Sequence, residues 1–123
     1  MQNSEIYINQ EFAKLESKDY VNAIIEFNKA IMINPNNAPI YLGRGMAYKA
    51  QENYSKAISD LNKAIEIDSN FGRAYHMRGD LKFHLEGKSG AYQDWREAAE
   101  LGYKESYEMT KDHCKNSNLI FNA

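Results

Sequence analysis

Apolar residues recur at helical spacing along most of the chain. Between residues 19 and 33 they lie three and four positions apart, which is the pattern of an amphipathic helix and not the alternation of a strand. This set consists of Val21, Ala23, Ile24, Ile25, Phe27, Ala30 and Ile31. The same kind of pattern predicts helices near residues 4–17, 19–33, 38–51, 53–67, 71–85 and 89–101. We therefore expect an all-α fold.

Residues that begin or end helices lie between the predicted segments. Pro35 and Pro39, the chain's two prolines, fall within INPNNAPIY and end the helix before them. Asn53 and Ser89 are predicted N-caps. Gly102 predicts a further stop, and a helical stripe follows it, made of Tyr103, Tyr107, Thr110 and Cys114. We expect a capping helix near residues 103–114 with a polar outer face, and a frayed tail over 117–123.

The sequence repeats itself when Tyr7 is placed on Tyr41 and Tyr41 on Tyr75, and such a fixed 34-residue shift is typical of repeat architectures. Side chains of the same size class coincide in four further sets: Ala23, Ala57 and Ala91; Phe27, Leu61 and Trp95; Ala30, Ala64 and Ala98; and Ile33, Ile67 and Leu101. Gly45 aligns with Gly79, whereas Gly43 aligns with Met77 and Asn9. One glycine of the segment GRGMAY therefore belongs to the repeat and the other does not.

This pattern resembles the tetratricopeptide repeat (TPR) family, in which an aromatic residue, leucine-glycine, tyrosine, alanine, an aromatic residue and proline occupy set places within a period of about 34 residues. The middle copy carries Tyr41, Gly45, Tyr48, Ala57, Leu61 and Ala64, with Arg44 at the leucine position. The resemblance implies repeats at residues 4–37, 38–71 and 72–105. It predicts an α-solenoid of three helix-turn-helix units plus the capping helix, in a single domain over residues 1–116.

The small aligned residues have a physical role that does not depend on the family. Helix axes that approach within about 8 to 10 Å need small side chains at the crossing, and Gly45 and Gly79 meet that need beside the bulky aligned residues. GRGMAY is predicted to lie inside a helix, with no strand before it and no third glycine. A phosphate-binding loop requires both, so we expect helix packing at this segment.

Composition narrows the classes of function. The 123 residues include 43% apolar and 26% charged residues, which is ordinary for a globular chain, and the net charge of −2 offers no general attraction to nucleic acid. No segment approaches the roughly 20 apolar residues of a membrane helix, and the N-terminus does not read as a secretory signal. Cys114, the single cysteine, has no internal disulfide partner. We expect a cytoplasmic protein that binds neither nucleic acid nor membrane.

Candidate chemistry in the sequence is sparse. His76, Asp80 and His84 are spaced four residues apart, so they share one helix face, yet only one His–Asp pair is close enough to share a metal ion. We expect neither a metal site nor a cofactor there. We also find no Ser-His-Asp or Cys-His arrangement that the repeat would bring together.

The resemblance to TPR domains implies a concave surface lined by the first helix of each pair. The predicted peptide-binding groove consists of Ile8, Asn9, Phe12, Leu42, Gly43, Met46, Lys49, Arg73, His76, Met77 and Asp80. Some TPR domains grip a chaperone's C-terminal carboxylate with one lysine, two asparagines and a basic pair. Here Ile8, Phe12 and Gly43 stand at the first three places, and of the basic pair only Arg73 remains, with Met77 at the other. The groove therefore favours an apolar or amphipathic peptide with an acidic residue facing Arg73 or Lys49.

We therefore expect a non-enzymatic protein-protein interaction module, with a protein or peptide as its partner. Two alternatives remain from the sequence. The chain is either a structural repeat protein that associates with its own copies, or a small metal-binding protein that uses His76, Asp80 and His84. A further possibility is that residues 119–121, LIF, cover the apolar part of the groove.

Overall fold

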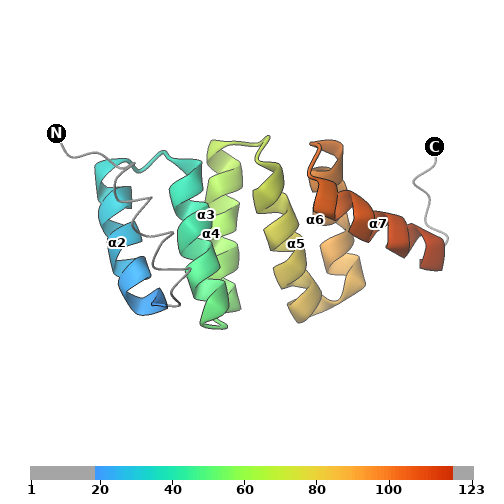
Figure 1. Cartoon of the computed structure of the whole chain (residues 1–123), viewed down its shortest axis with the longest axis horizontal. Coiled ribbons are helices and arrows are strands. Elements are labelled where there is room, and N and C mark those ends of the chain that lie inside the picture. Colours follow the sequence, from blue (N-terminus) through green and yellow to red (C-terminus); the bar gives the residue numbers. More distant parts are fainter. Residues whose placement is uncertain (1–18, 118–123) are drawn as a thin grey trace. The chain divides into compact units, whose positions relative to one another are not determined.

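The computed structural model describes residues 19–117, with side chains described through residue 110. The described part contains only helices: α2 (Tyr20–Ile33), α3 (Ala38–Ala50), α4 (Tyr54–Ile67), α5 (Gly72–Glu86), α6 (Lys88–Glu100) and α7 (Lys104–Ser117) (Figure 1). The all-α prediction is confirmed, and each helix boundary lies within a few residues of the one expected. The helix expected over residues 4–17 and residues 118–123 of the tail lie outside the described residues.

The chain divides into two compact units between Ser69 and Asn70. In the first unit α3 packs against both α2 and α4. In the second unit α6 packs against both α5 and α7. Each unit therefore contains one complete pair of antiparallel neighbours, α3 with α4 and α5 with α6. A third helix packs against one member of each pair.

Asparagine and glycine set several helix ends. The Asn37 side chain accepts a hydrogen bond from the Ile40 amide at 3.3 Å, and the Asn53 side chain accepts one from the Lys56 amide at 3.4 Å. The N-cap predicted at Ser89 is wrong, because α6 begins one residue earlier and Gly87 precedes it with φ of 84°. Glycine takes that left-handed conformation readily. The α5–α6 turn is thus built on backbone freedom and not on a side-chain cap.

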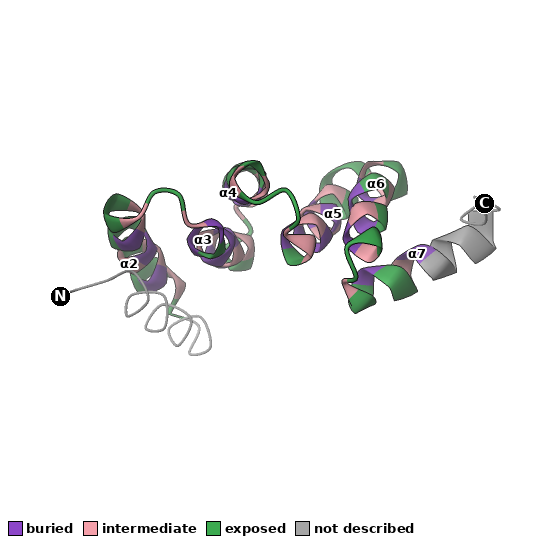
Figure 2. Cartoon of the chain, turned by 90° about the horizontal axis from the view of Figure 1, so that it is seen from above, coloured by how far each residue is buried: buried purple, intermediate pink, exposed green. Residues whose placement is uncertain are grey.

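The residues aligned by the 34-residue shift form most of the core. All three members of each alanine set, and the set formed by Phe27, Leu61 and Trp95, are buried. The set at the helix ends behaves differently, since Ile33 and Leu101 are exposed. Figure 2 shows buried and exposed positions on each of α2 to α6, as amphipathic helices require.

Gly45 and Gly79 lie at helix crossings, as predicted. A Cβ atom built on Gly45 would meet the Ala57 carbonyl oxygen of α4 at 3.3 Å. One built on Gly79 would meet Trp95 Cδ1 of α6 at 2.6 Å, which is closer than real Cβ atoms come. The absence of a side chain therefore permits the close approach of α3 to α4 and of α5 to α6.

Candidate functional site

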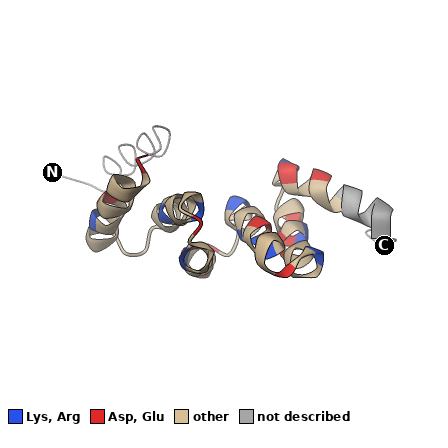
Figure 3. Ribbon diagram, turned by 90° about the horizontal axis from the view of Figure 1, so that it is seen from below, with Lys and Arg blue, Asp and Glu red and all other residues tan. Residues whose placement is uncertain are grey.

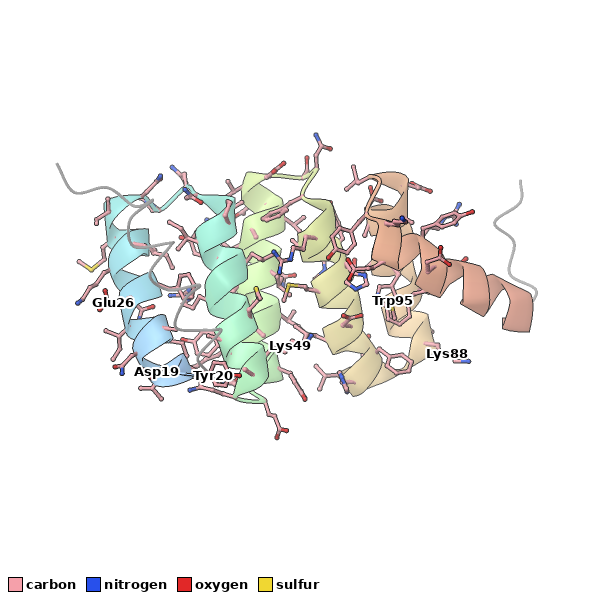
Figure 4. The ribbon with its side chains drawn as sticks, in the orientation of Figure 1. Asp19, Tyr20, Glu26, Lys49, Lys88 and Trp95 are labelled. Carbon is pink, nitrogen blue, oxygen red and sulfur yellow. The ribbon has the colours of Figure 1, made fainter. Side chains whose placement is uncertain are left out.

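The predicted groove residues of the first unit lie on α3. Leu42 and Gly43 are buried, while Met46 and Lys49 are half-buried; Figure 4 labels Lys49. The exposure expected for Leu42 is not found, because this residue is buried in a helix that packs against both α2 and α4. Ile8, Asn9 and Phe12 lie outside the described residues. Met46 and Lys49 are thus the accessible members of the set in this unit.

The groove residues of the second unit lie on α5. Arg73 is exposed and Asp80 is half-buried, whereas His76 and Met77 are buried. Met77 was predicted to line the groove, but a ligand cannot reach it at this buried position. The assignment of these residues to a peptide site stays a prediction. Arg73 and Asp80 are the members of the set that a ligand can reach in this unit.

His76 connects α5 to the start of α7. A hydrogen bond joins its Nδ1 atom to Ser106 Oγ, and its ring lies against Tyr103 with 4.9 Å between ring centroids. Its Nε2 atom lies 3.4 Å from Asp80 Oδ2. Because both ring nitrogens have polar neighbours, the histidine is buried with its hydrogen-bonding groups satisfied.

Asp80 connects α5 to α6. Trp95 Nε1 donates a 2.9 Å hydrogen bond to Asp80 Oδ1, and Figure 4 labels Trp95 on α6. The two carboxylate oxygens thus face different partners, Trp95 on one side and His76 on the other. The carboxylate has a fixed orientation while it remains 26% exposed.

The repeat was not expected to bring a Ser-His-Asp set together. The structure does contain a connected chain of Ser106, His76 and Asp80, and its serine lies on α7, outside the expected repeats. The arrangement lacks what a nucleophile requires, since Ser106 is 0% exposed and no substrate carbonyl can reach its hydroxyl. The chain of polar contacts, extended by Trp95, holds three helices together.

The prediction that Tyr107 and Thr110 share one face of the capping helix is also wrong. Ser106 and Thr110 are buried, whereas Tyr107 is exposed. The Thr110 hydroxyl donates to backbone carbonyl oxygens of its own helix, at 3.0 Å from that of Ser106. Small hydroxyl side chains can therefore line the buried face of α7, because each has a hydrogen-bond partner.

The alternative metal site is not assembled on α5. His76 and Asp80 lie together, but the His84 ring lies against Phe83, at 6.4 Å between centroids. Among the residues whose side chains are described, no group of three or more histidine, cysteine, aspartate or glutamate side chains could hold a metal ion. Within the same part of the chain, none of the helices is both long and apolar enough to cross a membrane.

The structure contains two equivalent arginine-aspartate ion pairs that were not predicted from the sequence. Arg44 Nε and Nη2 donate to the two Asp60 carboxylate oxygens at 2.9 and 2.7 Å, and Arg78 makes the same pair of bonds to Asp94 at 2.8 and 2.8 Å. Both aspartates are buried. The 34-residue shift aligns arginine with arginine and aspartate with aspartate, so that signal was present in the sequence.

The two arginines stay charged. The hydrogen bonds to Asp60 raise the pKa of Arg44, and those to Asp94 raise the pKa of Arg78. Each guanidinium also lies over a tyrosine ring, at 5.7 Å for Arg44 over Tyr41 and 5.6 Å for Arg78 over the repeat-equivalent Tyr75. Figure 3 shows both charge signs along α5 and α6, where the second pair lies.

Helices paired at short turns, with small residues at each crossing and a fixed sequence period, define the class of all-α helical-repeat proteins. Within this class, a family model for the tetratricopeptide repeat matches residues 38–71. This segment, which contains α3 and α4, is therefore a tetratricopeptide repeat. No curated protein matches the sequence as a relative.

Solved TPR structures share the fold over most of the chain. The Arabidopsis OM64 TPR domain is 27% identical, with a TM-score of 0.80 over 89% of this chain and 95% of that one. The second TPR of Spaghetti (RPAP3), bound to the HSP90 peptide SRMEEVD, is 25% identical, with a TM-score of 0.77 over 81% and 93% of the two chains. The first TPR of Spaghetti, bound to the same peptide, is 22% identical, with a TM-score of 0.84 over 96% and 95%. This last likeness shows the fold alone.

Proposed function

We propose that the chain is a non-enzymatic interaction module that binds an apolar or amphipathic peptide segment. Each unit offers its own contact surface: the accessible side chains of α3 in the first unit, and those of α5 in the second. The observation that carries the proposal is the likeness of the chain to the second TPR of Spaghetti, which was solved with a bound peptide. The half-buried Met46 supports it, since a flexible thioether adapts to varied apolar partners.

The peptide class differs from that of the two Spaghetti domains. Their ligand, SRMEEVD, is acidic at its C-terminal end. By the family resemblance, this chain has Ile8, Phe12 and Gly43 where a carboxylate clamp has lysine and asparagines, and Met77 in place of one basic residue. With those donors missing, we propose that an internal peptide segment binds here instead of a free C-terminus.

We also propose that the protein does not catalyse a reaction. The Ser106, His76 and Asp80 chain is the arrangement nearest to a catalytic one among the described side chains, and its serine is buried. We also propose that the protein works in the cytoplasm, because its single cysteine gives it no use for an oxidising compartment.

Substitution of Met46 tests the peptide proposal. A peptide selected from a random display library on the immobilised chain is labelled, and its affinity is measured by fluorescence polarisation. Met46→Glu should weaken binding by about tenfold or more, because it places a charge where an apolar side chain is bound. The helical circular dichroism signal should not change.

Met32→Glu is the matched control. Met32 is 84% exposed on α2, outside the proposed face, and the substitution changes size and charge in the same way. Its affinity should equal that of the unchanged chain. The proposal fails if the library yields no binder, or if both variants bind the selected peptide as well as the unchanged chain does. Met77 is not used, since a charge at that buried position would report on folding.

A further inference from the structure

Helix α5 carries two opposite charges on one face. Arg73 and Asp80 are seven residues apart, which is nearly two helical turns, so they lie on the same side at about 10 Å along the axis. His76 lies between them in sequence and is buried under the start of α7. The accessible part of this face is therefore dipolar, with a cation toward the start of the helix and a carboxylate beyond its middle.

The carboxylate of Asp80 is held in place before any ligand arrives. Trp95 Nε1 binds one oxygen at 2.9 Å, and His76 Nε2 lies 3.4 Å from the other. The Trp95 ring is itself packed against Gly79, the neighbour of Asp80 in the sequence. An acceptor that is already oriented loses little conformational freedom on binding a donor, which favours recognition at this position.

Tyr103 lies beside this face of α5, with its ring 4.9 Å from that of His76. Burial raises the pKa of its phenol, a hydrogen bond to Glu105 raises it further, and the nearby charges of Arg73 and Asp80 lower and raise it respectively. Its half-buried ring lies against His76, which lies between Arg73 and Asp80 in the sequence. An aromatic side chain therefore lies next to the two charges.

We propose that this face of the second unit, formed by Arg73, Tyr103 and Asp80, selects a peptide in the polyproline II conformation that carries an acidic and a basic residue three positions apart. The acidic residue pairs with Arg73, and the lysine or arginine pairs with Asp80. Polyproline II has three residues per turn and rises about 3.1 Å per residue, so residues three positions apart point to the same side and span about 9 Å, close to the roughly 10 Å between the two charges. The inference rests on the proposed peptide-binding function and specifies the ligand for it.

Charge complementarity separates this ligand from others. A uniformly acidic segment would place a like charge beside Asp80, which is unfavourable near a partly buried carboxylate. A purely apolar segment would cover that carboxylate without giving it a donor, which has a desolvation penalty. A segment with both charges places an opposite charge beside each side chain.

Designed peptides provide the test. Fluorescein-labelled dodecapeptides of alanine, leucine and serine carry one glutamate and one lysine, separated by one to six positions and placed in both orders. Their affinities for the full chain are measured by fluorescence polarisation at low salt. The proposal predicts that a separation of three binds about tenfold tighter than a separation of one or six, and that replacing the lysine by glutamine removes this advantage.

Three protein variants locate the effect. Asp80→Asn keeps an oxygen for Trp95 Nε1 but loses the charge, and it should bind the lysine and glutamine peptides equally. Trp95→Phe removes the donor that positions the carboxylate and should reduce the lysine preference several-fold, with the helical signal retained. Glu100→Gln, which removes an equal charge from the exposed face of α6, should keep the full preference.

The outcomes separate the two proposals. Peptides that bind without regard to spacing, or a lysine preference that survives Asp80→Asn, would overturn the inference and leave the peptide-binding function standing. The inference is also overturned if none of the designed peptides binds while the library-selected peptide does. Failure of both kinds of peptide to bind would instead remove the proposed function itself.

Discussion

Two glycines at the same repeat position experience different constraints. Around Gly45, a methyl group would press on a backbone carbonyl at 3.3 Å, which demands a small adjustment. Around Gly79, it would overlap the Trp95 ring at 2.6 Å. That ring cannot move aside without cost, because its Nε1 atom holds Asp80. The second crossing therefore depends on glycine more strictly than the first.

Gly79→Ala should lower stability by about 1 to 3 kcal/mol through overpacking, even though alanine favours a helix interior over glycine by about 1 kcal/mol. Gly45→Ala should have a much smaller effect, because its overlap is slight and the gain in helix propensity offsets it. Urea unfolding followed by circular dichroism measures both. A Gly79→Ala chain that unfolds at the same urea concentration as the parent would show that Trp95 yields freely.

Within each helix pair, a bidentate ion pair repeats together with the packing residues. Arg44 of α3 binds Asp60 of α4, and Arg78 of α5 binds Asp94 of α6. The surroundings of the two pairs differ, because Lys82 Nζ also approaches Asp94 at 3.3 Å. Among the described residues, Asp60 forms its ion pair with Arg44. Loss of an arginine therefore leaves a more isolated carboxylate in the first pair.

Arg44→Met should destabilise the chain by about 2 to 4 kcal/mol, since removing one partner of a buried pair leaves the other charge uncompensated. Arg78→Met should lower the free energy of unfolding by less, because Lys82 remains beside Asp94. The loss of stability caused by Arg44→Met, relative to the parent chain, should also become smaller as the pH falls from 7 to 5. An unpaired buried carboxylate takes up a proton more readily than a paired one. Equal losses in the two variants, or a deficit that does not depend on pH, would contradict this account.

Helices were the most predictable elements of the sequence. Apolar periodicity and the alanine sets placed α2 to α6 to within a few residues, because these signals are local and recur with the period of the repeat. The face of α7 was not predictable in the same way. Ser106 is buried there because His76, far earlier in the chain, satisfies its hydroxyl group, and no periodicity in α7 records that partner.

The candidate site was predictable only in part, for a similar reason. The resemblance to TPR domains selected α3 and α5, but exposure at each position depends on which neighbours pack over it. Leu42 and Met77 proved to be buried, whereas Arg73 is exposed. The fixed orientation of Asp80 required contacts from α6 that sequence spacing does not reveal.

At the scale of the whole molecule, the two helical units each present a different accessible surface. The first unit offers Met46 and Lys49 on α3, an apolar side chain with a cation. The second offers Arg73 and Asp80 on α5, two opposite charges beside an aromatic ring. The proposed function therefore assigns apolar recognition to the first unit and charge recognition to the second.

The most direct test of this function is a map of peptide binding on the full chain by nuclear magnetic resonance. The ¹⁵N-labelled protein is titrated with the library-selected peptide, and amide shift changes are recorded for every helix. Binding as proposed predicts the largest changes on α3 around Met46 and Lys49 and on α5 around Arg73 and Asp80. Changes confined to α2, α4 or α6 at saturating peptide would contradict the proposal.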